Sequence, residues 1–315
     1  MRLAVTDRCN LRCFYCMPEE GINYVEKKEL LSFEEMYRMI NAFGALGISK
    51  LRITGGEPFV RKGIMDFLHE VAANRFIEKV NITTNGTFTE DKVEQLERMG
   101  IHSINLSLDS LDKQRFFEIT RRNLYDKVMS TFEALMDSSI TTKINMVVME
   151  GRNIEDIYPM LELTRDHDVS VRFIEEMPFN GTLGQGNATF WPMGKILEYI
   201  KQEYPIEKLP DPPSSTSYNY QIKGFKGSFG IIAAYTRTFC GSCNRIRVTP
   251  QGDLRTCLYD KGSKNLRDII RTHDDDSKLQ EALHKAISNR AKDGFEAEKR
   301  RVEHPVSESM ATIGG

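Results

Sequence analysis

The sequence contains no apolar run long enough to cross a membrane, and its net charge of -2 over 315 residues is close to neutral. An excess of one charge, which would favour nucleic acid or a lipid surface, is therefore missing, and neither partner is expected. The chain also lacks an internal repeat, a coiled coil and the charged head and apolar stretch of a signal peptide. These absences predict a cytoplasmic protein. Its 315 residues are enough for the core of one barrel-sized domain and an appendage.

No cysteine is left over for a structural disulfide, because all six belong to two groups of three, and this usage indicates a reducing compartment. The first group, Cys9, Cys13 and Cys16, has the spacing C-x3-C-x2-C and follows a short apolar strand expected over residues 3–6. Three soft thiolates on one tight loop can hold three corners of a [4Fe–4S] cube and leave its fourth iron open. A zinc knuckle or a disulfide is the alternative, but neither explains why a fourth ligand is missing nearby.

The second group, Cys240, Cys243 and Cys257, has the spacing C-x2-C-x13-C. It too lacks a nearby fourth cysteine or histidine, and none of the six histidines of the chain lies near either group. This spacing fits a second cluster with an open iron. Zinc with a remote fourth ligand is an open alternative for this group.

Short β-like runs alternate with helical patterns from residue 2 to about residue 176, which is typical of βα units and a parallel sheet. Strands are expected over residues 3–6, 50–54, 79–84, 103–108, 141–149 and 169–176. Helices are expected over residues 32–47, 63–74, 90–99, 124–136 and 154–166. After Met177 the alternation ends, and we place a domain boundary near Gly181, a helix over 193–203 and a hairpin-like region over 218–235.

In every expected strand apolar and polar residues alternate, so that one set of alternate positions, or parity, is apolar and the other is polar. In the second strand Leu51 and Ile53 form the apolar parity, and Lys50 and Arg52 belong to the polar one. Helices must cover the outer face of a βα barrel, so we expect the apolar parity outside and the polar parity in the lumen. An open sheet with a solvated polar face is the alternative. A wet, cationic lumen of this kind suits a large anionic substrate.

The second expected strand ends in Gly55-Gly56-Glu57-Pro58. The two glycines let the backbone approach a ligand, and exposed carbonyls with the Glu57 carboxylate can receive an ammonium group, although a plain turn is the alternative. Together with the first cysteine group and its Tyr15, this run resembles the radical-SAM superfamily, in which the open iron binds S-adenosylmethionine and a GGxP run binds its methionine part. The same likeness implies that Tyr15, Thr83, Ser107 and the backbone at Met177 contact the rest of S-adenosylmethionine.

A narrower resemblance covers nearly the whole chain. Residues 239–247, then Gly252, Leu254 and Cys257, and the ending over 310–315 resemble the GTP 3′,8-cyclases of molybdenum cofactor biosynthesis, the MoaA family. Residues 5–10, 52–58, 105–110 and 172–175 also fit this family. The short leader usual before the first cysteine is absent, which leaves the subunit contacts and a possible homodimer open.

The resemblance implies an α/β fold: an incomplete (βα)6-type radical-SAM barrel over residues 1–180 and a β-rich region over 181–315. The second region would carry an auxiliary [4Fe–4S] cluster on its three cysteines and a Gly-Gly tail, Gly314 and Gly315, which we hypothesise folds into the lumen. GTP would lie between the two clusters. The cations implied to hold its triphosphate are Arg2, Lys50, Arg52, Lys143 and Arg172, with Arg245 and Arg247 also reaching the nucleotide.

The chemistry implied by the resemblance starts when an electron from the first cluster splits S-adenosylmethionine into methionine and a 5′-deoxyadenosyl radical. This radical would remove hydrogen from the ribose C3′ of GTP, the C3′ radical would attack guanine C8, and reduction of the resulting radical would complete the cyclic nucleotide. An electron donor and the next enzyme of the pathway are the implied partners. A radical-SAM peptide-modifying enzyme with an auxiliary cluster is the alternative, whereas a ubiquitin-like sulfur carrier ending in Gly-Gly would be a much smaller domain.

Overall fold

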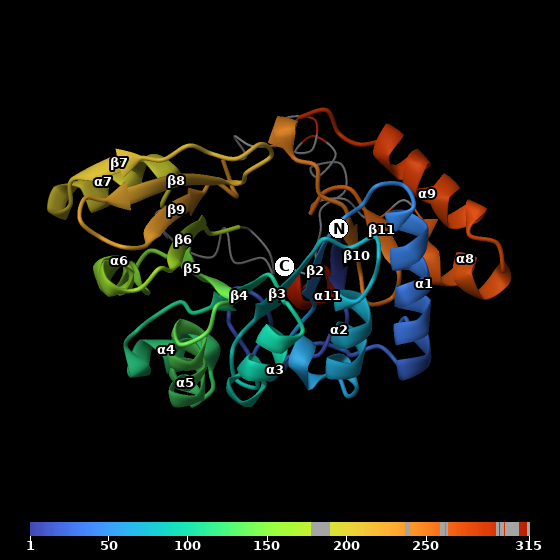
Figure 1. Cartoon of the computed structure of the whole chain (residues 1–315). Coiled ribbons are helices and arrows are strands. Elements are labelled where there is room, and N and C mark those ends of the chain that lie inside the picture. The colour runs from blue at the N-terminus through green and yellow to red at the C-terminus, as the bar shows by residue number, and fades with distance from the viewer. Residues whose placement is uncertain are drawn as a thin grey trace.

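The computed structural model of the chain describes residues 1–177, 190–236, 240–258, 262, 264–293, 296, 299 and 309–313. Its central part is a parallel α/β unit, as expected (Figure 1). The strands are β1 (Arg2–Ala4), β2 (Lys50–Thr54), β3 (Lys79–Thr84), β4 (Ser103–Ser107), β5 (Thr141–Val148) and β6 (Ser170–Glu175). The helices are α1 (Phe33–Gly44), α2 (Ile64–Ala72), α3 (Val93–Arg98), α4 (Lys113–Thr120), α5 (Tyr125–Met136) and α6 (Ile157–Asp166).

All six expected strands are confirmed, with ends that differ by no more than a few residues. Helix α4 was not expected, although Asp112 caps it by accepting a 2.8 Å hydrogen bond from the Arg115 backbone N–H. Short 3-10 helices supplement these elements at η1 (Lys27–Glu29), η2 (Pro58–Val60), η3 (Glu90–Lys92) and η4 (Ile154–Asp156). No helix in the described residues is both long enough and apolar enough to span a membrane.

The residues after β6 extend the sheet at both of its edges. On one side β9 (Ser228–Ile232) pairs parallel with β6 and continues through β8 (Ser217–Ile222) to β7 (Ile206–Lys208), beside α7 (Met193–Glu203). On the other side β10 (Arg247–Val248) pairs parallel with β1 and leads through β11 (Asp253–Arg255) to β12 (Lys264–Asn265). The described strands form one sheet in the order β12-β11-β10-β1-β2-β3-β4-β5-β6-β9-β8-β7.

The two ends of this sheet are not paired with each other, so the barrel is incomplete, as the family resemblance implies. The predicted boundary near Gly181 and the Gly314–Gly315 tail lie outside the described residues. The division into residues 1–180 and 181–315 stays a prediction.

The two faces of the sheet have the predicted character. In β3 and β6 the burial alternates residue by residue, and apolar side chains such as Val80, Ile82, Val171 and Phe173 are buried in two large cores with the helices. The opposite parity, including Arg52, Thr83 and Arg172, faces an internal cavity. The polar face therefore lines a cavity, although the described strands do not close into a barrel.

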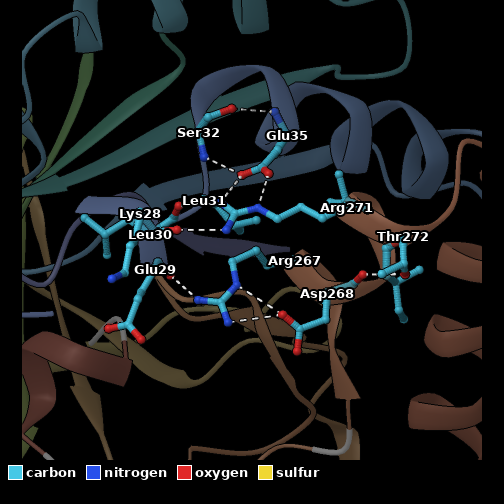
Figure 2. A network of polar contacts seen from close by, with 12 residues as sticks. Lys28, Glu29, Leu30, Leu31, Ser32, Glu35, Arg267, Asp268, Arg271 and Thr272 are labelled. Atoms are coloured by element: carbon cyan, nitrogen blue, oxygen red, sulfur yellow. Dashed lines mark hydrogen bonds and ion pairs between the residues drawn. The ribbon is translucent and has the colours of Figure 1, made fainter. Parts of the chain in front are cut away.

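The C-terminal helices are fixed to the first βα unit by arginines (Figure 2). Helices α8 (Leu266–Thr272) and α9 (Ser277–Ser288) lie beside α1 in Figure 1. Arg267 donates to the Glu29 carbonyl, and Arg271 forms an ion pair with Glu35 at 2.6 Å and donates to the Lys28 carbonyl at 2.8 Å. Glu35 also completes a capping box with Ser32 at the start of α1. This network holds together segments that are more than two hundred residues apart in sequence.

Candidate functional site

A cavity of about 820 Å³ lies along the polar face of the sheet, and cysteines of both groups line its wall. This volume is at the upper end of the range for small-molecule sites. Nearly all site residues predicted from the sequence line the cavity: Arg2, Cys9, Cys13, Tyr15, Cys16, Lys50, Arg52, Gly55, Gly56, Thr83, Ser107, Arg172, Met177, Cys240, Cys243, Arg245, Arg247 and Cys257. Of the predicted set, Glu57 and Lys143 are not among the lining residues.

The first cysteine loop is held in place by backbone contacts around its three thiols. Arg12 donates to the Cys9 carbonyl at 2.7 Å, and the Cys16 backbone N–H donates to the Cys13 carbonyl at 2.9 Å. The Asn85 side chain, at the end of β3, donates to the Cys9 sulfur at 3.6 Å. Asn85 was not predicted, because only the folded chain brings it next to the cysteine loop.

The first cysteine group fits an iron–sulfur cluster. Burial raises the pKa of Cys9 to about 11 and that of Cys16 to about 12, and burial together with the nearby Asp109 also raises the pKa of Cys13. Thiolates in this position therefore require a nearby positive charge, which bound iron supplies. The all-sulfur donor set suits iron in particular.

No group of three His, Cys, Asp or Glu side chains in the described parts of the chain is arranged around a single ion. In a [4Fe–4S] cluster each of the three thiolates would bind a different iron, so this cofactor does not require three ligands around one ion. All six cysteines lie within the described residues and none of them forms a disulfide, so the disulfide alternative is not realised.

The glycines after β2 are required by close packing against the cysteine loop. The Gly56 backbone N–H donates to the Thr6 carbonyl at 2.8 Å, and a Cβ added at Gly56 would lie 2.3 Å from the Arg8 carbonyl oxygen. Gly55 has a φ of +148°, and a Cβ there would lie 2.5 Å from the Thr6 carbonyl oxygen. The turn therefore supports the segment that leads into Cys9.

Glu57 lies beneath the cavity wall, and its carboxylate does not face the cavity. It is fully buried and accepts hydrogen bonds from the Phe59 N–H at 3.1 Å, the Thr84 hydroxyl at 2.9 Å and the Asn85 N–H at 2.7 Å. Burial raises the pKa of Glu57 to about 7. In this structure the carboxylate ties the glycine turn to the end of β3.

Replacing Gly56 with alanine is expected to displace residues 6–8 and lower the iron bound by the first cysteine group. Overpacking of this kind typically lowers the free energy of unfolding by about 1–3 kcal/mol. Urea unfolding and iron analysis measure the two effects. Gly194→Ala is the matched control, because no atom lies within 4 Å of the added Cβ and alanine favours helix α7. An unchanged iron content in Gly56→Ala would contradict the supporting role of the turn.

Tyr15 is fixed by Asp109, a residue to which the sequence analysis assigned no role. The Tyr15 hydroxyl donates to one Asp109 oxygen at 2.7 Å, and the Val147 backbone N–H donates to the other at 2.8 Å. Burial raises the pKa of Asp109 to about 6. Because Asp109 follows β4 and Val147 lies on β5, this contact joins the first cysteine loop to the middle of the sheet.

Arginines on three adjacent strands form a row inside the cavity. Arg2 on β1 is in register with Arg52 on β2 and with Arg247 on β10, so their side chains lie on the same face of the sheet. The pKa values of Arg52, Arg172 and Arg247 are each lowered to about 10. Burial is the main cause, and repulsion from neighbouring arginines is the second. The Arg172 Nε atom is buried and has no hydrogen-bond partner within the described residues.

Lys143 on β5 adds to this positive charge, although it does not line the cavity. Burial and repulsion by Arg172 and Arg52 lower its pKa to about 8. Cations brought together in a buried site are costly unless an anion pairs with them. The arrangement therefore predicts an anionic ligand with several acceptor oxygens, because guanidinium groups bind phosphate through paired hydrogen bonds.

The second cysteine group lies next to these cations and next to the C-terminal helix. Cys240 begins η5 (Cys240–Ser242), and Arg245 donates to the Cys243 sulfur at 3.9 Å. Helix α11 (Met310–Ile313) packs against Cys257 and Met177 through Ile313. The Ser309 hydroxyl, just before this helix, donates to the Cys16 carbonyl at 2.7 Å. Residues 309–313 therefore contact both cysteine groups.

Two family models match most of the chain. The model of the radical SAM superfamily matches residues 3–164, and the model described as Molybdenum Cofactor Synthesis C matches residues 169–295. The solved structure of Streptococcus suis SuiB bound to S-adenosylmethionine resembles the chain with a TM-score of 0.58, covering 84% of this chain and 63% of that one. At 17% sequence identity this likeness shows the fold alone.

Two curated relatives show the family more narrowly. Molybdenum cofactor biosynthesis protein moc-5 of Caenorhabditis elegans is 37% identical over 317 residues, which cover 100% of this chain and 53% of the relative. The GTP 3′,8-cyclase of Listeria monocytogenes is 36% identical over 324 residues, which cover 100% of this chain and 96% of that protein. The chain thus spans about half the length of the nematode relative and nearly all of the bacterial one. It belongs to the radical SAM superfamily and, within it, to the molybdenum cofactor family of the GTP 3′,8-cyclases.

Proposed function

We propose that this chain converts GTP to 3′,8-cyclo-7,8-dihydroguanosine 5′-triphosphate by radical SAM chemistry, an early step in molybdenum cofactor synthesis. The observation that carries the proposal is the row of buried arginines in the same cavity as both cysteine groups. It provides for a polyphosphate beside a site suited to an iron–sulfur cluster. The relative from Listeria monocytogenes, whose name is GTP 3′,8-cyclase, supports the same activity.

The two cysteine groups would each hold a [4Fe–4S] cluster. Cys9, Cys13 and Cys16 would bind the cluster that, when present, supplies the electron for cleavage of S-adenosylmethionine. Gly55 and Gly56 leave the backbone accessible at the cavity wall for the methionine part. The groups proposed to hold the remainder of S-adenosylmethionine are Tyr15, Thr83, Ser107 and the backbone at Met177, all of which line the cavity.

The arginine row would hold the triphosphate and so orient the ribose. Arg2, Arg52 and Arg247 project from neighbouring strands in one register, and Arg172 approaches from β6. Rigid strands fix these side chains, which limits the positions open to the ribose C3′. Met310 and Ala311, which line the cavity, would also help to exclude water from the reacting groups.

The proposed cofactor content is testable by iron analysis. Anaerobic reconstitution of the full chain is expected to give about eight irons, because each cubic cluster holds four. Stoichiometric zinc bound by Cys240, Cys243 and Cys257 would instead support the zinc alternative for the second group. Cys243→Ser should retain about half of the iron and keep the first cluster.

The proposed activity is tested by anaerobic incubation with GTP, S-adenosylmethionine and a one-electron reductant, followed by mass analysis of the nucleotide. The expected product is an isomer of GTP, formed together with methionine and 5′-deoxyadenosine. Modification of a supplied peptide without conversion of GTP would favour the peptide-modifying alternative. The electron donor, the enzyme that consumes the product and a homodimer are proposed on the family resemblance. The cytoplasmic location is proposed on the sequence features described above.

A further inference from the structure

Glu175 is a fully buried carboxylate at the end of β6, and neither the sequence analysis nor the proposed mechanism gives it a role. Its two oxygens accept hydrogen bonds from two other segments of the chain. The Met193 backbone N–H donates at 2.7 Å, the Tyr235 and Thr236 backbone N–H groups donate at 2.9 and 2.8 Å, and the Thr236 hydroxyl donates at 3.0 Å.

The first of these segments is the start of α7. Pro192, the residue at the N-cap position, provides no side-chain hydrogen bond to the helix. Glu175 therefore supplies from β6 the negative charge and the acceptor that the first turn of a helix requires. This contact fixes α7 relative to the end of the strand.

The second segment leads directly into the second cysteine group. Thr236 precedes Cys240 by four positions, and the ring of Tyr235 packs against Phe190 with a centroid distance of 4.5 Å. Three of the four donors to Glu175 come from Tyr235 and Thr236. Since Glu175 ends a strand in the middle of the sheet, it provides this segment with a rigid attachment point.

We propose that Glu175 is a positioning residue for the second cluster: its carboxylate holds residues 235–236 so that Cys240 and Cys243 reach the cavity. The inference rests on the proposed function, because it assumes a cluster on the second cysteine group. Glu175 also precedes Met177 by two residues, and Met177 packs beside Cys257 and Ile313. Both the approach to Cys240 and the packing around Cys257 are thereby tied to the end of β6.

Glu175→Gln removes this arrangement with little change in size. A carboxylate accepts at both oxygens, whereas an amide presents an NH₂ group at one of them. In either orientation of the amide, its NH₂ group would face at least one of the backbone N–H groups of Met193, Tyr235 and Thr236. That N–H group would then have no acceptor in a buried site. The segment before Cys240 is then expected to move away from β6.

The experiment compares iron content and electron paramagnetic resonance spectra of the reduced full-length protein. The wild type is expected to bind about eight irons, and Glu175→Gln about four, with loss of the second-cluster signal. The first-cluster signal, its change on adding S-adenosylmethionine, and cleavage of S-adenosylmethionine should persist. Cys243→Ser provides the reference spectrum of a protein that lacks the second cluster. Glu198→Gln, at an exposed position on α7, is the matched control and should bind about eight irons.

A second, milder variant applies if Glu175→Gln does not fold. Thr236→Val removes one of the four donors and leaves the carboxylate with its backbone partners. Release of the second cluster to an iron chelator should then be about fivefold faster than in the wild type, the equivalent of one ordinary hydrogen bond. The first cluster should be released at the wild-type rate.

The outcomes separate this inference from the proposed function. Eight irons in the wild type and in Glu175→Gln, or equal chelator release in Thr236→Val, would overturn the role of Glu175 alone. Only four irons in the wild type would overturn the two-cluster part of the proposed function, and the role of Glu175 with it. Loss of both cluster signals in a folded Glu175→Gln protein would show a general structural role and also overturn the inference.

Discussion

Replacing Cys13 with serine is expected to abolish cleavage of S-adenosylmethionine while leaving the fold and the second cluster in place. The Cys13 carbonyl, which receives the Cys16 and Met17 backbone N–H groups, is retained in this variant, so the loop keeps its shape. Only the sulfur ligand is lost. Loss of a residue that only orients a metal ligand typically lowers metal affinity or activity by about 10–100-fold. Loss of a ligand itself should therefore lower the rate of cleavage by more than about 100-fold.

The measurement is the formation of 5′-deoxyadenosine under anaerobic conditions, together with the iron content. Cys243→Ser is the matched control, because it removes one thiol of the other cysteine group, which lines the same cavity. It should retain cleavage of S-adenosylmethionine and lose cyclisation of GTP. Equal cleavage by Cys13→Ser and the wild type would show that the first cysteine group does not hold the reactive cluster.

Arg172→Lys is expected to weaken GTP binding by about 10–100-fold even though the charge is kept. Hydrogen bonds to charged groups contribute about 1.5–3 kcal/mol, and lysine cannot reproduce the paired donors of a guanidinium. The buried Nε atom of Arg172, which has no partner among the described residues, is a donor that such a ligand could satisfy. Equilibrium binding of GTP and of guanosine measures the effect.

The loss should be large for GTP and small for guanosine, because the phosphates are the expected partners. Arg52→Lys should have a smaller effect, since Arg52 already donates to the Ile82 carbonyl and the Thr83 hydroxyl, both at 3.4 Å. Arg98→Lys, at an exposed position on α3, should bind both ligands as the wild type does. Equal losses for GTP and guanosine in Arg172→Lys would mean that this arginine maintains the fold and does not bind phosphate.

The parallel core of the fold could be predicted from the sequence because its signals are local. The alternation of Val80 and Ile82 with Asn81 and Thr83 is enough to assign both faces of a strand covered by helices. At the β6 edge, the predicted helix over 193–203 and hairpin-like region over 218–235 are confirmed as α7 and as β8 with β9. The addition at the β1 edge could not be predicted, because β10 is only two residues long and is defined by its pairing with a strand at the other end of the chain. Helix α4 was missed because its short pattern is weakly amphipathic.

The candidate site could be predicted where chemistry depends on residue type and spacing, as for the two cysteine groups and the lumen-facing arginines. The residues that support them were missed. Asn85, Asp109 and Glu175 act through contacts made by folding, and a lone acidic or amide residue has no local signature of that role. For Glu57 the sequence indicated the turn, whereas the direction of the carboxylate depends on the buried donors of β3.

The pairing of β1 with β10 affects the order in which the protein can assemble during synthesis. Arg2 pairs with Arg247, so one edge of the parallel sheet stays open until the segment around Arg247, far along the chain, has also been synthesised. Contacts between such distant segments form slowly, and an open strand edge can pair with other chains. The loop with Cys9, Cys13 and Cys16 follows that strand, and its contact with Ser309 forms later still. We therefore expect iron to be delivered after translation, to a chain that needs protection from aggregation until then.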